Sequence, residues 1–144
     1  MVMSFAVLLL SLITGGGAFL PVCSEVSAAD ASAVLGVPAI RTKDPSGCGW
    51  EDSTHKRTLS VAYVKVAAMF EGARADAVKN GAMQDEKGLG IKAFSSAPSK
   101  YNGGRVALYC LKGSTVLILD VEAEGSVTRL PQMREIMRKL ASLP

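Results

Sequence analysis

Three cysteines and one histidine carry the most reactive side chains of this 144-residue chain. Thiolate and imidazole groups are common zinc ligands, so Cys23, Cys48, His55 and Cys110 have the right types for a metal site. They lack the short paired spacings that zinc motifs show. We therefore expect no metal ion in this protein.

His55 also stands near Asp52 and Ser53, which are the residue types of a hydrolytic triad. A triad needs side chains that converge from separate elements, with a base that a third group supports. These three residues share one polar connection, so a solvated His55 is the better interpretation. The adjacent acidic residues Glu51-Asp52 and Asp85-Glu86 are likewise expected to be solvated charges. The sequence predicts no catalytic residue.

The segment Gly88–Ala93 reads G-L-G-I-K-A and fits the dinucleotide-binding pattern G-x-G-x-x-A. That motif needs a strand before it and a helix after it, so that the helix N-terminus meets the pyrophosphate. Here a charged stretch precedes the glycines and a strand-like segment follows them. We expect a tight bend and no cofactor.

The N-terminal segment is uncharged and largely apolar. Its apolar run over residues 4–13 is typical of the hydrophobic region of a signal peptide and is too short to span a bilayer. Small residues before a cut after Ala18 predict a signal peptide over residues 1–18. An uncleaved anchor over residues 2–22 and a lipid anchor on Cys23 are the alternatives. All three predict an extracytoplasmic protein, secreted, periplasmic or membrane-attached, that meets the membrane only through this segment.

Export places the cysteines in an oxidising compartment, where disulfides persist. Three cysteines allow one disulfide and one remaining thiol. Cys110 lies in a predicted core strand and suits a small buried hydrophobe, which leaves a Cys23–Cys48 disulfide. A Cys48–Cys110 disulfide between two strands is the alternative, and the number of cysteines does not decide between the two pairings.

Length and charge restrict the function further. Residues 19–144 are enough for a single domain with its own core. The net charge of +3, from 16 basic and 13 acidic residues, is only mildly basic. Basic residues are not interleaved with aromatic ones, so we expect no nucleic-acid binding.

The stretch Arg105–Glu124 gives the clearest structural pattern. Two apolar, β-branched runs flank Lys112-Gly113-Ser114, which predicts an antiparallel hairpin. Gly113 as the first loop residue predicts a type II′ turn, because glycine tolerates the positive φ needed there. That register pairs Cys110 with Leu117. Alternation then places one set of side chains on the core face: Val106, Leu108, Cys110, Leu117, Leu119, Val121 and Ala123.

Other local patterns predict the remaining elements. Ser27 and Asp30 give a start signal for the first helix, and Gly36 gives its stop. Helices are expected over residues 24–35, over 67–80 and from Pro131 onward, and strands over 48–52, 58–66 and 91–97. The last helix carries one apolar stripe, formed by Met133, Ile136, Met137 and Leu140. Residues 83–90 are expected to be irregular. The order predicts an α+β fold, an antiparallel sheet of about five strands with an N-terminal, a central and a C-terminal helix packed on it.

Several motifs follow one another along the chain in a recognisable order. They are Cys23-Ser24 opening the first helix, Val34-Leu35-Gly36 closing it, Cys48-Gly49-Trp50, Leu59-Ser60-Val61, Gly88-Leu89-Gly90 with Ala93, the hairpin and the C-terminal helix. With them, residues 22–143 resemble the small exported bacterial lipoprotein domains grouped as the domain of unknown function 3558 family. In that family the first cysteine and the cysteine of Cys-x-Trp recur, so the resemblance favours the Cys23–Cys48 pairing. The family implies no established activity.

These observations predict an exported cell-envelope module that binds an unknown envelope protein or a small ligand and is not an enzyme. Loops on a rigid scaffold commonly form contact surfaces, which points to Asp44, Tyr101, Asn102 and Arg105. The alternatives are a small extracytoplasmic enzyme, either a hydrolase or a thiol redox protein, and a structural component of the envelope.

Overall fold

The computed structural model of the protein describes residues 24–42, 48–89, 91–97 and 104–143. The predicted signal peptide, residues 1–18, lies outside these ranges. The helices are α2 (Ala28–Leu35), α3 (Ala68–Lys79) and α4 (Leu130–Ala141), with a 3-10 turn η2 (Ser126–Arg129) before α4. The strands are β1 (Ile40–Thr42), β2 (Cys48–Glu51), β3 (Thr58–Val64), β4 (Met83–Glu86), β5 (Lys92–Ser96), β6 (Arg105–Lys112) and β7 (Thr115–Glu122).

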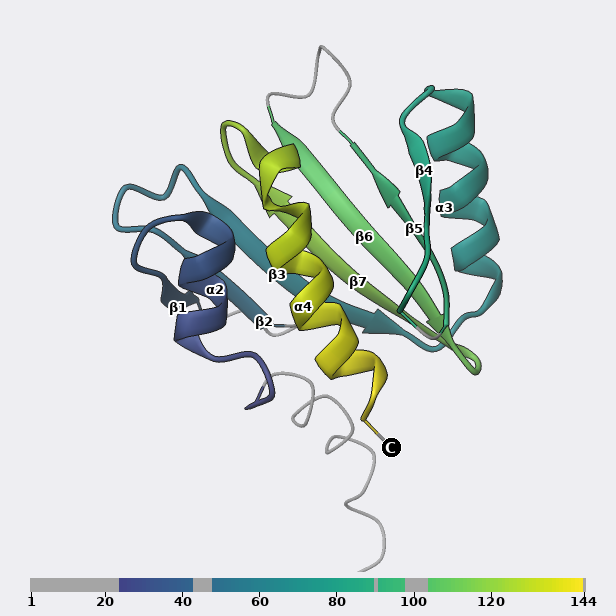
Figure 1. The fold of residues 1–144 in the computed structure, drawn as a ribbon, viewed down its shortest axis with the longest axis horizontal. Coiled ribbons are helices and arrows are strands. Elements are labelled where there is room, and N and C mark those ends of the chain that lie inside the picture. The colour runs from purple at the N-terminus through teal and green to yellow at the C-terminus, as the bar shows by residue number, and fades with distance from the viewer. Residues whose placement is uncertain (1–23, 43–47, 90, 98–103, 144) are drawn as a thin grey trace, which may run out of the picture.

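The seven strands form one antiparallel sheet in the order β1-β2-β3-β7-β6-β5-β4. Helices α2 and α4 lie side by side across the near face of the sheet in Figure 1. Helix α3 packs on the opposite face, over β4, β5 and β6. The α+β class with an N-terminal, a central and a C-terminal helix is confirmed, and the sheet has two strands more than expected.

The hairpin β6–β7 has the predicted register, with Cys110 opposite Leu117 and Lys112 opposite Thr115. Gly113 has φ 61°, and Ser114 does not share a positive φ, as a type II′ turn requires. All of the predicted core-face residues are at most 6% exposed: Val106, Leu108, Cys110, Leu117, Leu119, Val121 and Ala123. They form the floor on which α2 and α4 pack.

Helix α2 begins and ends as its sequence predicts. The Ser27 hydroxyl accepts a hydrogen bond from the Asp30 backbone N–H at 3.0 Å, and the Asp30 carboxylate accepts one from the Ser27 N–H at 3.0 Å. This reciprocal capping box satisfies two backbone donors at the helix start. Gly36 ends the helix with φ 73°, a left-handed conformation that glycine adopts without steric cost.

The predicted stripe of α4 is buried against the sheet, with Met133 and Met137 fully enclosed and Ile136 and Leu140 nearly so. A second, smaller core lies under α3. There Phe70 meets Phe94 edge to face at 5.1 Å between ring centroids, and Phe94 stacks on Tyr109 at 4.7 Å. Both faces of the sheet near the hairpin turn are therefore covered.

The two additional strands lie at the edges of the sheet. Residues 83–86 were expected to be irregular, but they form β4, which pairs with β5 so that Glu86 lies opposite Ala93. The prediction was wrong because M-Q-D-E has no apolar alternation, and the strand is held by its ladder and by helix partners on both faces. Within the described part of the chain, no helix is long and apolar enough to cross a membrane.

Candidate functional site

Of the predicted contact residues, Asp44, Tyr101 and Asn102 lie outside the described residues. Arg105 begins β6, and its Nε donates to both carboxylate oxygens of Asp120 at 3.0 and 2.9 Å. Glu122 lies 3.8 Å from the same nitrogen. The hydrogen bond to Asp120 is the main cause that raises the pKa of Arg105. Arg105 is thus held by carboxylates on β7.

His55 is exposed, as predicted, and its Nδ1 lies 2.8 Å from Oε1 of Glu51. The hydrogen bond that His55 donates to Glu51, and then the charge of Glu51, raise the pKa of His55. The prediction that Asp52 is solvated was wrong. Its side chain accepts hydrogen bonds from the Thr54 hydroxyl at 2.6 Å and from the backbone N–H of Lys56 at 2.9 Å. Asp52 therefore organises the turn before β3 and is not a partner of His55 in catalysis.

The interpretation of Asp85-Glu86 as solvated charges was wrong for Glu86, which is buried. Its carboxylate accepts two hydrogen bonds from Arg134 on α4 and one from the Ser95 hydroxyl at 2.8 Å. Burial alone raises the pKa of Glu86, but the hydrogen bonds from Arg134 and Ser95 outweigh it and lower the pKa. Both oxygens of the Glu86 carboxylate are therefore engaged in hydrogen bonds that join β4 to α4 and β5. Asp85 pairs with Arg74 on α3 at 3.1 Å.

Cys110 is a free thiol that is completely buried, and burial raises its pKa to about 12. Cys48 is buried and is not a free thiol. The alternative Cys48–Cys110 disulfide is therefore wrong. The Cys23–Cys48 disulfide involves a residue outside the described ranges and stays a prediction. Among the described residues, no three histidine, cysteine or acidic side chains lie together as metal ligands.

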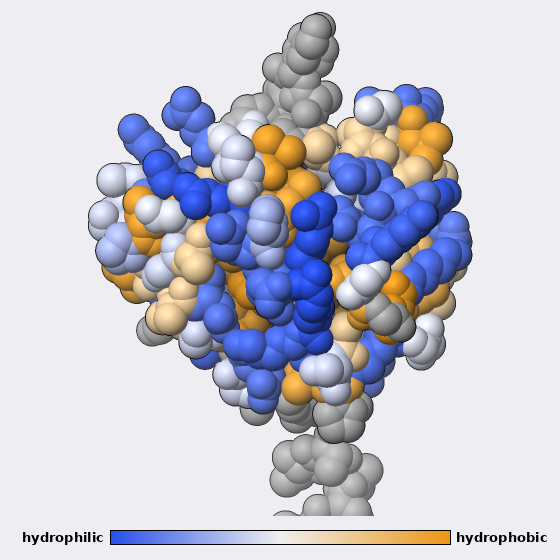
Figure 2. Space-filling model, viewed as in Figure 1, coloured by the Kyte–Doolittle hydropathy of each residue, from blue (hydrophilic) through white to orange (hydrophobic). Residues whose placement is uncertain are grey.

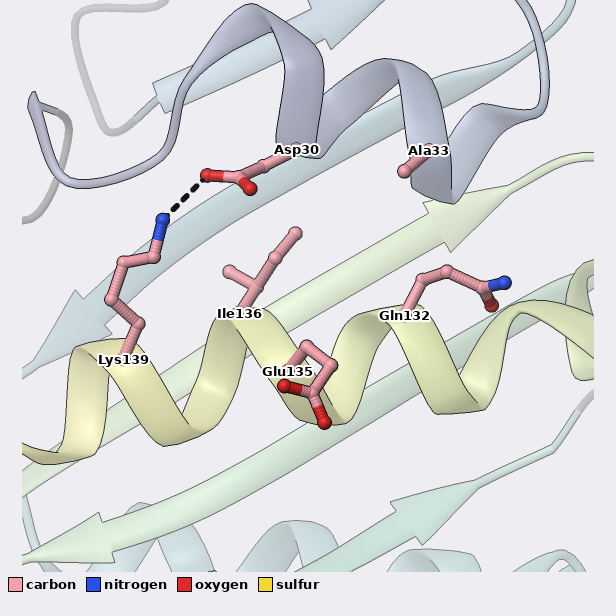
Figure 3. A pocket seen from close by; sticks show the side chains of 6 residues that line it. All are labelled: Asp30, Ala33, Gln132, Glu135, Ile136 and Lys139. Carbon is pink, nitrogen blue, oxygen red and sulfur yellow. Dashed lines mark hydrogen bonds and ion pairs between the residues drawn. The ribbon is translucent and has the colours of Figure 1, made fainter.

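A groove of about 280 Å³ lies between α2 and α4. Figure 3 shows the side chains that line it: Asp30, Ala33, Gln132, Glu135, Ile136 and Lys139. Ile136, only 3% exposed, points toward α2 and forms an apolar floor, and the exposed Ala33 lines the α2 side of the groove. At one end Lys139 donates to Asp30 across the groove at 2.8 Å. The groove is thus apolar at its floor and polar at its rim.

The charged groups at this groove already have partners. Burial opposes ionisation of Asp30, but hydrogen bonds from Lys139 and Ser27 outweigh it, so the pKa of Asp30 is lowered. Glu135 pairs with Arg138 one helical turn further along α4. Figure 2 shows hydrophilic surface running down this face, with small hydrophobic areas beside it. A ligand therefore meets compensated charges at the rim of the groove.

Gln132 differs from the other polar groups of the groove. Its Oε1 is enclosed, and no described residue donates a hydrogen bond to it. A buried acceptor without a donor costs about 1–3 kcal/mol relative to a satisfied one. Such groups are rare in folded proteins and need an explanation at each occurrence.

Sequence reasoning missed this groove. The stripe of α4 predicted the buried side of that helix, but Gln132, Glu135 and Lys139 lie at the border of the stripe and read as ordinary surface residues. The groove exists only because α2, about a hundred positions earlier in the chain, packs beside α4. The nearest sequence signal was Asp30, which was identified only as a helix start residue.

Comparison with known proteins leaves the family open. No family model and no curated protein sequence matches this chain. The resemblance to the domain of unknown function 3558 family stays a prediction. Among solved structures the chain is similar to the solution structure of cyanobacterial PsbP (CyanoP) from Synechocystis sp. PCC 6803. The identity is 12% and the TM-score 0.42, over 69% of this chain and 76% of that one, and at this level the likeness bears on neither function nor partners.

Proposed function

We propose that this protein is a non-catalytic binding module that works outside the cytoplasm, at the cell envelope, and holds a partner or small ligand in the groove between α2 and α4. The observation that carries the proposal is the groove itself, which has an apolar floor at Ile136 and a polar rim at Asp30 and Lys139. Binding sites commonly combine an apolar lining with a few placed polar groups.

The groove is built on two helices fixed to the sheet, which supports a preformed site. Lys139 on α4 bridges to Asp30 on α2, and Asp30 also forms the capping box of its own helix with Ser27. Both walls are therefore held in place before a ligand arrives. A site formed by rigid elements costs little ordering on binding.

The enzyme alternatives find little support in the described residues. A thiol redox protein needs an accessible thiolate, because the thiolate is the reacting species. Cys110 is enclosed in the core and its pKa is raised to about 12, so it stays protonated and out of reach. Export is supported by the apolar N-terminal segment. It is also supported by Cys48, which is not a free thiol, because disulfides persist in oxidising compartments.

The proposal is tested by screening small neutral and charged fragments against the full chain by ¹H–¹⁵N NMR. We expect shift changes to cluster at Ala33, Gln132 and Ile136. The variant Ala33→Trp fills the groove from α2 and should abolish them. The control Ala75→Trp makes the same change on an exposed position of α3, on the other face of the sheet, and should leave them intact.

Two outcomes contradict the proposal. One is a screen in which no fragment shifts the groove residues. The other is a set of groove shifts that survives in Ala33→Trp as it does in Ala75→Trp, because the fragments would then bind elsewhere.

A further inference from the structure

One edge of the sheet carries a row of lysines. Five neighbouring strands turn at this edge, in the order β3-β7-β6-β5-β4. Lys65 follows the end of β3, Lys112 ends β6 and Lys87 follows the end of β4, and we call these three residues the lysine edge. A fourth lysine, Lys92, begins β5 between them. Four steps of about 4.8 Å between adjacent strands spread this row over roughly 19 Å.

The lysine edge has no acidic partner. Lys92 forms an ion pair with Glu71 in the first turn of α3. By contrast, no carboxylate of the described residues pairs with any of the three lysines that form the lysine edge. At the opposite edge of the sheet, Arg105 is held by carboxylates of β7. The lysine edge thus carries positive charge that no ion pair compensates.

Exposed apolar side chains lie next to these charges. Val66 directly follows Lys65 and is 54% exposed. Met69, in the first turn of α3, is also exposed. Basic side chains beside exposed apolar ones are typical of surfaces that rest on a bilayer, because the cations meet anionic headgroups while the apolar groups reach the acyl boundary.

The apolar N-terminal segment joins the domain at this same end. Arg134 in the middle of α4 meets Glu86 at the end of β4, and Lys139 near the end of α4 meets Asp30 in the first turn of α2. The end of α4, the start of α2 and the lysine edge therefore lie together, at the lower end of Figure 1. In the sequence, residues 1–23 precede α2 and contain no charged side chain.

We propose that the lysine edge docks on the headgroups of an anionic lipid bilayer. It adds a second membrane contact to the N-terminal segment, through which alone the sequence predicted one. A bilayer fits better than a small anion, because the lysines are spread in a row and do not converge on one point. It fits better than an acidic protein, because an apolar segment with affinity for lipid leaves from the same end. The lysine edge shares no residue with the groove between α2 and α4, so this inference does not depend on what the groove binds.

The test measures how the full chain partitions onto two kinds of vesicle. One is phosphatidylcholine alone, and the other contains equal parts of phosphatidylcholine and anionic phosphatidylglycerol. The N-terminal segment is present in both measurements, so the ratio of the two partition coefficients reports the charge-dependent contact. We expect this ratio to be well above one at about 0.1 M salt and to approach one at about 1 M salt, where the Debye length is only about 3 Å. A ratio of one at the lower salt concentration overturns the inference.

The double variant Lys65→Gln with Lys112→Gln removes two charges from the lysine edge. We expect its binding to anionic vesicles at about 0.1 M salt to weaken about thirtyfold, with binding to phosphatidylcholine vesicles unchanged. The control Lys56→Gln with Lys79→Gln lowers the net charge equally, at two exposed lysines of the opposite end. The length of β3, about 23 Å, separates that end from the bilayer by more than the Debye length of about 10 Å, so the control should bind as the wild type does. Equal weakening in both double variants would mean attraction by net charge alone and would overturn the inference.

The apolar part of the contact is tested with a second matched pair. Val66→Ser removes an exposed apolar side chain beside the lysine edge, and the control Val78→Ser removes one that is 51% exposed at the far end of α3. We expect Val66→Ser to weaken binding to anionic vesicles about fourfold and Val78→Ser to leave it unchanged. Equal effects of the two substitutions would overturn the inference that this end faces the bilayer.

A soluble polyanion distinguishes an acidic protein from a bilayer as the partner. Poly-glutamate is titrated into the full chain and into the Lys65→Gln, Lys112→Gln variant. We expect it to bind more weakly than the anionic vesicles do, because it offers no acyl boundary to Val66 and Met69. Poly-glutamate binding that depends on these two lysines and is tighter than vesicle binding would assign the surface to an acidic protein and overturn the inference.

Discussion

Arg134 on α4 donates two hydrogen bonds to Glu86 at the end of β4, from Nε to Oε2 at 2.7 Å and from Nη2 to Oε1 at 3.0 Å. The two residues are 48 positions apart, and the Glu86 side chain is 4% exposed against 28% for Arg134. This pair joins the edge strand of the sheet to the C-terminal helix. Its bidentate geometry is the strongest form of the arginine–carboxylate contact.

Glu86→Gln should lower the free energy of unfolding by about 3 kcal/mol, the lower end for a broken buried ion pair, because Arg134 is partly exposed. Urea denaturation measures it. The control Asp85→Asn breaks the neighbouring exposed pair with Arg74 and should cost less than about 1 kcal/mol. The double variant Glu86→Leu with Arg134→Met should regain part of the loss, since no unpaired charge remains. Equal costs for Glu86→Gln and Asp85→Asn would contradict this account.

The same carboxylate should make stability depend on acid pH. The folded pKa of Glu86 lies below its usual value of 4.5, because the hydrogen bonds from Arg134 and Ser95 outweigh the effect of burial. The ionised Glu86 carboxylate therefore stabilises the folded state fully above about pH 4.5, and this stabilisation is lost as pH falls through the folded pKa. Unfolding free energies measured from pH 7 down to about pH 3 should fall more steeply for the wild type than for Glu86→Gln. If the free energies of unfolding of the wild type and of Glu86→Gln fell in parallel with pH, Glu86 would not be the group that causes the loss of stability in acid.

His55 should titrate above its usual pKa of 6.5, because the hydrogen bond and then the charge of Glu51 favour its protonated form. A raised pKa means that the contact stabilises the protein below pH 6.5 and that this effect is lost as pH rises through the folded pKa. The chain has a single histidine, so its ring resonances in NMR report this group alone. Glu51→Gln should return the midpoint toward 6.5. If the titration midpoint of His55 did not change in Glu51→Gln, the contact between His55 and Glu51 would be contradicted.

Cys110 should be unreactive in the folded protein. It is fully enclosed by the core face of the sheet, and burial raises its pKa to about 12. The thiol reagent DTNB should find no reactive thiol in the native state. After unfolding in guanidinium without a reductant, it should find one per chain if Cys23 and Cys48 form a disulfide, whereas three would refute that pairing.

The glycines at the two ends of the hairpin should differ in their tolerance of a side chain. Gly113 has φ 61° with open space around it, so Gly113→Ala should cost about 1 kcal/mol from backbone strain alone. Gly104 has φ 96°, and a Cβ there would also clash with the carbonyl oxygen of Ala123. Gly104→Ala should therefore lower the free energy of unfolding more than Gly113→Ala does. The reverse order in urea denaturation would contradict this.

Short stretches of sequence were enough to predict several elements of this fold. The register of β6–β7 follows from side-chain alternation around Gly113, because a shift by one residue would expose the whole core face. The cap of α2 follows from Ser27 and Asp30, three residues apart. The buried stripe of α4 follows from the spacing of its apolar residues. In each case the interaction that decides the structure lies within a few residues along the chain or across one turn.

Only the tertiary structure decided the edge strands, the burial of Glu86 and the groove. Strand β4 has two adjacent acidic residues and no apolar alternation, and it is held by Arg134 on one face and by Arg74 on the other. The groove is closed by Lys139 and Asp30, which are 109 positions apart. Polar side chains carry no periodic signal for such partners, because their burial depends on which distant group arrives to satisfy them. The sequence alone therefore determined the core, and the packing of α2 beside α4 determined the candidate site.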